Sequence, residues 1–209
     1  MSVSASVSMP MPARYPDDDQ VVVIGPIPWE LYIAWDDARG DQANPHVAYL
    51  DGMMEIMTHG PQHENEKKLI ARLVEAYAEE MDLPLNGFGN TTWRKGTGKK
   101  KAGLEPDECY FLGAVKEYPD LAIEVVRTSG GVDKLEIYRR LRVQEVWFWV
   151  EEAFQLFALD ATRYRPIARS ALLPGLDLAK VGEVVRTTDP GQQTASVKAF
   201  RAWLRSATA

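Results

Sequence analysis

The chain has 209 residues, of which 45% are hydrophobic and 26% are charged, and its formal net charge is −6. This length allows one domain with a substantial core, because domains usually contain roughly 100–200 residues. The negative net charge excludes a protein whose whole surface is basic and binds a polyanion. Contact with nucleic acid therefore requires a local basic patch. The only cysteine, Cys109, excludes an internal disulfide and fits a reducing, intracellular setting.

The N-terminal residues 1–20 are rich in Ser, Pro and Asp. We expect them to form a flexible segment, followed by a single domain over residues 21–209. The start of the chain lacks the apolar core of a signal peptide, and no apolar stretch approaches the roughly 20 residues that span a bilayer. The expectation is a cytoplasmic protein without a membrane span.

The first half of the chain predicts two helices around a hairpin. Residues 27–39 favour a helix with Pro28 in its first turn, where a missing N–H group matters least. Residues 46–57 predict two strands around Asp51-Gly52, a strong hairpin signal. Residues 60–81 predict the longest helix, with one apolar stripe and a charged opposite face. That stripe consists of Leu69, Ile70, Leu73, Val74, Tyr77 and Met81.

The second half predicts strands interrupted by one helix and closed by another. Residues 82–113 indicate two strands around a basic, glycine-rich turn, and the apolar run at 119–126 indicates a strand buried on both faces. The remaining expected elements are a helix at 132–143, strands at 144–152 and 153–161, a loop with a short strand at 163–178, and a helix at 195–207. This order predicts an α/β fold with a central mixed sheet flanked by helices.

Two acids mark consecutive predicted strands. Asp107 stands where one strand begins, and Glu124 interrupts the apolar centre of the next. Neighbouring strands lie roughly 4.8 Å apart, so paired carboxylates there would suit a hard divalent cation. A buried acid without a partner is unfavourable, and either a metal or a basic side chain can compensate it. Lys134 opens the following helix and can reach back, which completes a set able to hydrolyse a phosphodiester.

Five segments in order resemble the Uma-type restriction endonuclease family, a branch of the PD-(D/E)XK nuclease superfamily. The resemblance runs from about Tyr49 to Asp160. The segments are "YLDGMMEIM", "GPQHENEKKLIARL", "EPDECYF", "YPDLAIEVV" and "DKLEIYRRLRVQEVWFWV". The resemblance implies a restriction-endonuclease-like core and a metal-dependent DNA endonuclease.

The resemblance also implies roles for individual residues. Pro106-Asp107 matches the "PD" element and Glu124 the "(D/E)" element. In the superfamily these acids hold Mg²⁺ or Mn²⁺, aided by the backbone carbonyl after the glutamate, here that of Val125. The superfamily's lysine position holds Val126 in this chain. The branch places a lysine on the next helix instead, which implies the catalytic role for Lys134.

Two further residues match positions that the branch uses. These additional catalytic candidates are Glu55 in the hairpin and His63 at the start of the long helix. The superfamily often adds an acid from this helix, for which Glu64 or Glu66 is the local candidate.

Each of these residues also has a purely structural interpretation. Asp107 follows proline in a good turn sequence, and Glu124 could form a core ion pair with Arg127 or Lys134. Lys134, His63 and Glu55 could be ordinary surface residues. Trp147 and Trp149 share one face of their strand and indicate core or a subunit contact rather than base stacking.

One turn of the chain carries a dense basic patch. The residues are Arg94, Lys95, Lys99, Lys100 and Lys101. They could clamp a nucleic-acid backbone without reading bases, or they could be a solvated hairpin tip. A clamp predicts binding that weakens steeply with salt.

The sequence leaves three functional hypotheses. The first is the DNA endonuclease, acting as a homodimer because cutting both strands needs two sites, with the aromatic strand "VWFWV" as a possible contact area. The second is a degenerate nuclease fold that serves as a binding or regulatory module, favoured by Val126 and by the acidic net charge. The third is a metal hydrolase acting on RNA or on a small molecule.

Overall fold

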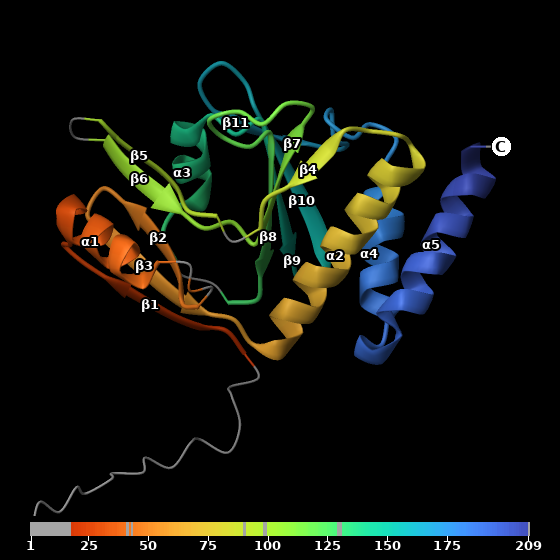
Figure 1. The fold of residues 1–209 in the computed structure, drawn as a ribbon, viewed down its shortest axis with the longest axis horizontal. Helices are drawn as coiled ribbons and strands as arrows, with labels where there is room; N and C mark the ends of the chain where they lie inside the picture. The colour runs from red at the N-terminus through yellow and green to blue at the C-terminus, as the bar shows by residue number, and fades with distance from the viewer. Residues whose placement is uncertain are drawn as a thin grey trace, which may run out of the picture.

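The strands of the protein form two sheets, and one helix packs between them (Figure 1). This arrangement is seen in a computed structural model that describes residues 18–40, 42, 44–89, 91–97, 100–128 and 131–208. None of the helices in these ranges combines the length and apolar character needed to cross a membrane.

The first sheet is antiparallel and has the strand order β1-β3-β2-β6-β5. Its strands are β1 (Gln20–Ile24), β2 (His46–Leu50), β3 (Met53–Thr58), β5 (Trp93–Thr97) and β6 (Lys100–Leu104). The β2–β3 turn occurs at Asp51 and Gly52, which both adopt positive φ angles, as this type of turn requires. Helix α1 (Trp29–Arg39) lies against this sheet through the stacked rings of Tyr32 and Tyr49.

The second sheet is mixed and has the order β11-β10-β9-β8-β7-β4. Its strands are β4 (Leu85–Gly87), β7 (Glu108–Leu112), β8 (Leu121–Val126), β9 (Glu145–Val150), β10 (Ala153–Leu159) and β11 (Tyr164–Ile167). Only β8 and β9 among these pair in parallel, joined by helix α3 (Lys134–Leu141). A parallel pair needs such a crossover, because the chain must return to the same end of the sheet.

The two faces of the second sheet meet different partners. On one face lie the helices α2 (Pro61–Glu80), α4 (Leu178–Thr187) and α5 (Gln193–Thr208), side by side in Figure 1, with the short 3-10 helix Pro190–Gln192 before α5. Ile123 and Val125 of β8 belong to this core. Ala122 faces the opposite core, which contains α3 and residues of the first sheet. Because side chains alternate along a strand, Glu124 projects into the space beside α3.

The structure confirms most expected elements, including the hairpin, both helices that follow it, and the strands β8, β9 and β10. The expected central mixed sheet flanked by helices is the six-stranded one, and a second, antiparallel sheet that was not expected lies beside it. The chain crosses from the first sheet to the second at Glu105-Pro106-Asp107, between β6 and β7. Proline fits this crossing because it has no N–H group to donate to a strand ladder.

Residues 82–113 contain four strands, β4 to β7, where two were expected, and β1, α4 and the short 3-10 helix were not anticipated. The start of α4 carries a readable signal, since the Asp177 side chain caps it by accepting from the N–H groups of Ala179 and Lys180. Of the segment expected to be flexible, residues 1–17 lie outside the described part of the chain. Asp19 is buried and Gln20 begins β1, so the folded domain includes residues before 21.

Candidate active site

Asp107 and Glu124 lie next to each other on adjacent strands, as the sequence predicted. Glu108 pairs with Ile123 in the antiparallel β7–β8 ladder, and one step further along brings Asp107 beside Glu124. Both side chains are almost fully buried, with 1% and 0% of their surface exposed. The N–H group of Val125 donates to Oδ2 of Asp107 over 2.8 Å, which fixes this carboxylate to the neighbouring strand.

Lys134 reaches Glu124. Its Nζ atom lies 2.6 Å from Oε2 of Glu124, and the hydroxyl of Tyr138, one helical turn later, donates to Oε1. Asp133 caps helix α3 by accepting from the N–H group of Glu136, and so fixes where Lys134 begins the helix. A lysine on this helix therefore stands beside the acid, while the position two residues after Glu124 holds the apolar Val126.

The charges of this group influence one another. Burial works against the charged form of Lys134, but the negative charges of Glu124, Asp107 and Glu55 hold its pKa above the usual value. Burial raises the pKa of Glu124, opposed by the ammonium group of Lys134. Burial also acts against the ionised form of Asp107, yet His63 holds its pKa well below the usual range. A cationic lysine and an ionised Asp107 therefore coexist in one largely buried group.

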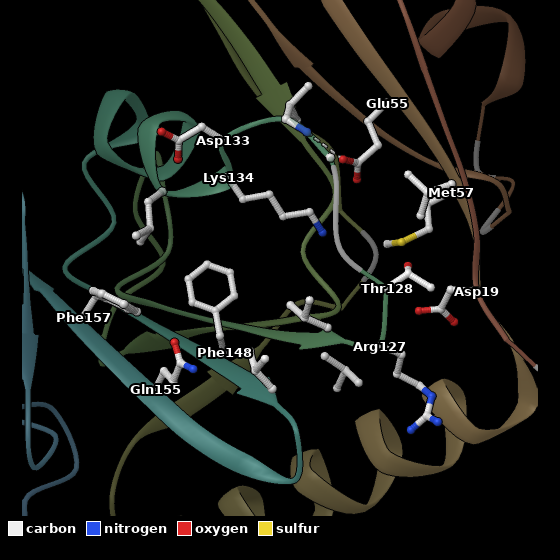
Figure 2. A pocket seen from close by; sticks show the side chains of 17 residues that line it. Asp19, Glu55, Met57, Arg127, Thr128, Asp133, Lys134, Phe148, Gln155 and Phe157 are labelled. Atoms are coloured by element: carbon white, nitrogen blue, oxygen red, sulfur yellow. Dashed lines mark hydrogen bonds between the residues drawn. The ribbon is translucent and has the colours of Figure 1, made fainter.

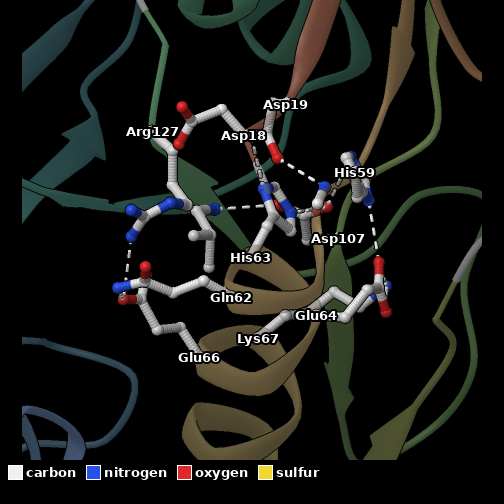
Figure 3. Close-up of polar contacts among 12 residues, drawn as sticks. Asp18, Asp19, His59, Gln62, His63, Glu64, Glu66, Lys67, Asp107 and Arg127 are labelled. Atoms are coloured by element: carbon white, nitrogen blue, oxygen red, sulfur yellow. Dashed lines mark hydrogen bonds and ion pairs between the residues drawn. The ribbon is translucent and has the colours of Figure 1, made fainter. Parts of the chain in front are cut away.

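His63 lies on the other side of Asp107. Its Nε2 atom is 3.1 Å from Oδ1 of Asp107, and its Nδ1 atom is 2.8 Å from Oδ2 of Asp19 (Figure 3). Burial lowers the pKa of His63, but its contacts with Asp107 and Asp19 outweigh burial and raise the pKa to about 9. The sequence did not single out Asp19, which the expected flexible segment contained.

Glu55 has a different position from the other acids. It lies on β3 in the first sheet, and its Oε2 atom accepts from the N–H group of Val132 over 2.9 Å. Val132 belongs to the connection between β8 and α3. Glu55 thus ties this connection, and with it the start of the lysine-bearing helix, to the first sheet.

A pocket of about 360 Å³ opens beside these residues. Lys134 projects toward its centre, with Glu55 and Asp19 on one side and the rings of Phe148 and Phe157 on the other (Figure 2). Asp107 and Glu124 do not line the pocket and lie behind Val125 and Lys134. The acids are therefore shielded, and Lys134 is the group that the pocket exposes.

The acid pair has acceptor capacity for a divalent cation. Oδ1 of Asp107 faces Nε2 of His63 at 3.1 Å and can accept a second interaction, while Oδ2 is occupied by Val125. Each oxygen of Glu124 accepts one hydrogen bond, and a carboxylate oxygen can accept a second interaction. Asp107 therefore fits as a ligand directly, and Glu124 fits if it shares an oxygen with Lys134.

Glu105, the acid two residues before Asp107, has a structural role. Its carboxylate forms a buried ion pair with Arg39 of α1 and accepts from the hydroxyl of Thr92 over 3.2 Å. These contacts compensate the negative charge of Glu105 at the point where the chain crosses between the sheets.

The basic residues of the β5–β6 hairpin fall into two groups. Arg94 pairs with Asp36 at 2.7 Å, and Lys101 pairs with Glu30 at 3.2 Å, so acids of α1 compensate both. Lys95 lies 5.3 Å from the ring centre of Tyr118, and Lys100 is exposed. Lys99 lies outside the described residues. Lys95 and Lys100 line a hollow of about 200 Å³ together with Arg139, Arg140 and Arg142.

The aromatic strand β9 is interior. It lies between β8 and β10, and Trp147 and Trp149 are buried in the core of this chain. This agrees with the core interpretation of the two tryptophans and removes the strand as a contact area for a second subunit.

Comparison with known proteins assigns the chain to a family. No protein with a curated description matches the chain. A crystal structure at 1.96 Å resolution, titled as a "putative nuclease belonging to DUF820" from Anabaena variabilis ATCC 29413, is similar with a TM-score of 0.52 and 13% identity. The similarity covers 77% of this chain and 99% of that chain, and it supports the restriction-endonuclease-like fold. The family model Uma2, described as "Putative restriction endonuclease", matches residues 29–187, and the chain therefore belongs to the Uma2 family.

Proposed function

We propose that the protein is a metal-dependent DNA endonuclease. Family membership supports a nuclease. The observation on which the finer proposal rests is the approach of Lys134 to within 2.6 Å of Glu124, next to the buried carboxylate of Asp107. Two carboxylates and a lysine around one point are the groups that phosphodiester hydrolysis requires.

Each residue has a separate task in this proposal. Oδ1 of Asp107 and one oxygen of Glu124 would hold Mg²⁺ or Mn²⁺, with the carbonyl of Val125 as a further ligand. The bound ion would supply a polarised phosphate and a more acidic water. Lys134 places positive charge where the pocket meets the acids, and there it can stabilise charge that develops on the phosphate. Tyr138 keeps Glu124 oriented through its hydroxyl group.

The basic hairpin would hold the nucleic-acid backbone. Lys95 and Lys100 are the members of the original patch that share a cationic hollow with arginines of α3. Arg94 and Lys101 are engaged by acids, so they would contribute less. Contacts of this kind bind phosphates without reading bases.

Incubation with supercoiled plasmid and Mg²⁺ or Mn²⁺ tests the proposal. The wild-type protein should cut, and Asp107→Ala, Glu124→Gln and Lys134→Met should each lose at least about a hundredfold in rate. Glu183→Gln, in an exposed pair with Lys180, is the matched control and should cut normally. Cleavage that survives the substitution of Asp107 would exclude this site.

The burial of both acids favours a second candidate, a binding or regulatory module on the same fold. That protein would retain plasmid DNA in a gel-shift assay without cutting it under either metal. A panel of RNA substrates would separate the third possibility, an RNA-directed hydrolase.

Homodimerisation is proposed because two cuts in a duplex need two active sites. Analytical ultracentrifugation at micromolar concentration, with and without a DNA duplex, measures it. A protein that stays monomeric under both conditions and cuts only one strand of the duplex would contradict homodimerisation.

A further inference from the structure

The chain contains three histidines, and all three gather at Asp107. His46 begins β2, His59 directly follows β3, and His63 lies in the first turn of α2. The ring centres of His46 and His59 are 4.2 Å apart, and those of His59 and His63 are 3.7 Å apart. Three segments of the fold thus bring imidazole rings to one buried carboxylate.

The nitrogen atoms that face this carboxylate have no hydrogen-bond partner. Nε2 of His59 lies 3.6 Å from Oδ1 of Asp107. Among the described residues, Nε2 of His59 and Nδ1 of His46 form no hydrogen bond. His46 is 5% exposed and the side chain of His59 is 0% exposed, so water does not compensate them from the surface. Buried imidazole nitrogens without partners beside a carboxylate are the arrangement that a cation stabilises.

The far side of the His59 ring is arranged as in metal sites. Its Nδ1 atom lies 2.9 Å from Oε1 of Glu64, which also accepts from Lys67 (Figure 3). A carboxylate that holds Nδ1–H leaves the lone pair on Nε2, which is the form that binds a metal. Glu64 would therefore orient His59 from outside the ligand set.

The kind of donor selects the kind of ion. Imidazole nitrogen suits Zn²⁺, Co²⁺, Ni²⁺ and Fe²⁺, whereas Mg²⁺ prefers oxygen and keeps its waters. Two donors at about 2.1 Å from a tetrahedral ion lie roughly 3.4 Å apart. The 3.6 Å between Nε2 of His59 and Oδ1 of Asp107 is close to this separation.

We propose that His46, His59 and Asp107 form a binding site for a divalent first-row transition-metal ion. A ring nitrogen of each histidine and Oδ1 of Asp107 are the ligands. His63 stays outside the ligand set, because its two ring nitrogens already face the carboxylates of Asp19 and Asp107 at 2.8 Å and 3.1 Å. The site shares Asp107 with the proposed nuclease centre, but it requires neither Glu124 nor Lys134.

Titration of the metal-free, full-length protein with Co²⁺ in the absence of nucleic acid tests the site. One equivalent should bind and produce visible ligand-field absorption, Zn²⁺ should displace it, and a large excess of Mg²⁺ should not. His46→Gln, His59→Gln and Asp107→Asn should each weaken Co²⁺ binding by at least about tenfold. Glu145→Gln, which also replaces a buried acid but one held by Trp147 and Ser170, should stay within about threefold of the wild type.

A measurement on the unmodified protein covers the case in which a buried variant fails to fold. Pulsed EPR of the wild-type protein loaded with one equivalent of Cu²⁺, an ion that prefers imidazole ligands, should show coupling to histidine nitrogen. Absence of a one-to-one site in the wild type, or binding unaffected by both histidine substitutions in folded variants, would overturn the proposal. Binding lost in Glu124→Gln but kept in His59→Gln would assign the ion to the acid pair instead.

Plasmid cleavage is assayed separately from metal binding. A protein that binds Co²⁺ but does not cut plasmid would refute the proposed nuclease activity and would leave this metal site supported.

Discussion

The ammonium group of Lys134 lies 2.6 Å from Oε2 of Glu124, and both groups are screened from solvent. The contact joins the central strand β8 to the helix that follows it. It supplies the lysine that the position of Val126 lacks, so it is the contact on which the proposed chemistry depends.

Lys134→Met should destabilise the protein, because it leaves Glu124 buried without its cation. The expected loss is about 3 kcal/mol in the free energy of unfolding, measured by urea denaturation at neutral pH. Lys180→Met is the matched control, since Lys180 forms an exposed pair with Glu183 and should change stability by less than about 0.5 kcal/mol. Adding Glu124→Gln to Lys134→Met should recover part of the loss, and equal effects of the two lysine substitutions would contradict a buried pair.

The contacts of His63 predict that stability falls as the pH rises. Its pKa is raised to about 9 from the usual value of 6.5, so the folded state binds the proton more tightly than the unfolded state. The stabilisation is fully present below about pH 6.5 and is lost as the pH rises through about 9, with a magnitude of about 3 kcal/mol. Urea denaturation of the metal-free protein across this window measures it. His63→Gln should flatten the profile, and a wild-type profile that is already flat would argue against a protonated His63.

Glu55→Ala should release the connection between β8 and α3. The substitution removes the acceptor for the N–H group of Val132, so that amide should exchange with deuterium faster by at least about tenfold. Plasmid cleavage should fall with it, because Lys134 begins the helix after this connection. Glu55→Gln keeps an acceptor oxygen and should retain most of the protection. Unchanged exchange at Val132 in Glu55→Ala would show that the hydrogen bond does not hold the connection.

The basic hairpin should divide into strong and weak contributors to DNA binding. Lys95→Ala and Lys100→Ala should each weaken binding and reduce the slope of log K against log salt by about 0.9, one phosphate contact each. Arg94→Ala and Lys101→Ala should have smaller effects, because Asp36 and Glu30 already engage these side chains. Fluorescence anisotropy with a labelled duplex at several salt concentrations measures the slopes. Equal slopes for the wild type and for Lys100→Ala would show that Lys100 does not contact the phosphate backbone of the DNA.

Local patterns in the sequence correctly predicted many of the helices and strands. The apolar stripe of α2, the Asp51-Gly52 turn and the run "LAIEVV" are each formed by near neighbours along the chain, and each predicted element is present. Helix α4 was missed although Asp177 marks its start, because no element was expected between residues 178 and 195. The strand β1 was missed because it directly follows a segment whose composition indicates a flexible tail.

The sequence by itself determined that Asp107 and Glu124 would meet, because consecutive strands tend to pair and pairing places opposite residues side by side. Only the tertiary structure decided that a second, antiparallel sheet forms, that Lys134 turns inward, and that Asp19 reaches His63. It also decided that His46 and His59 converge on Asp107. These contacts depend on how helices and sheets pack, and packing joins segments far apart in the chain whose relation no local pattern records.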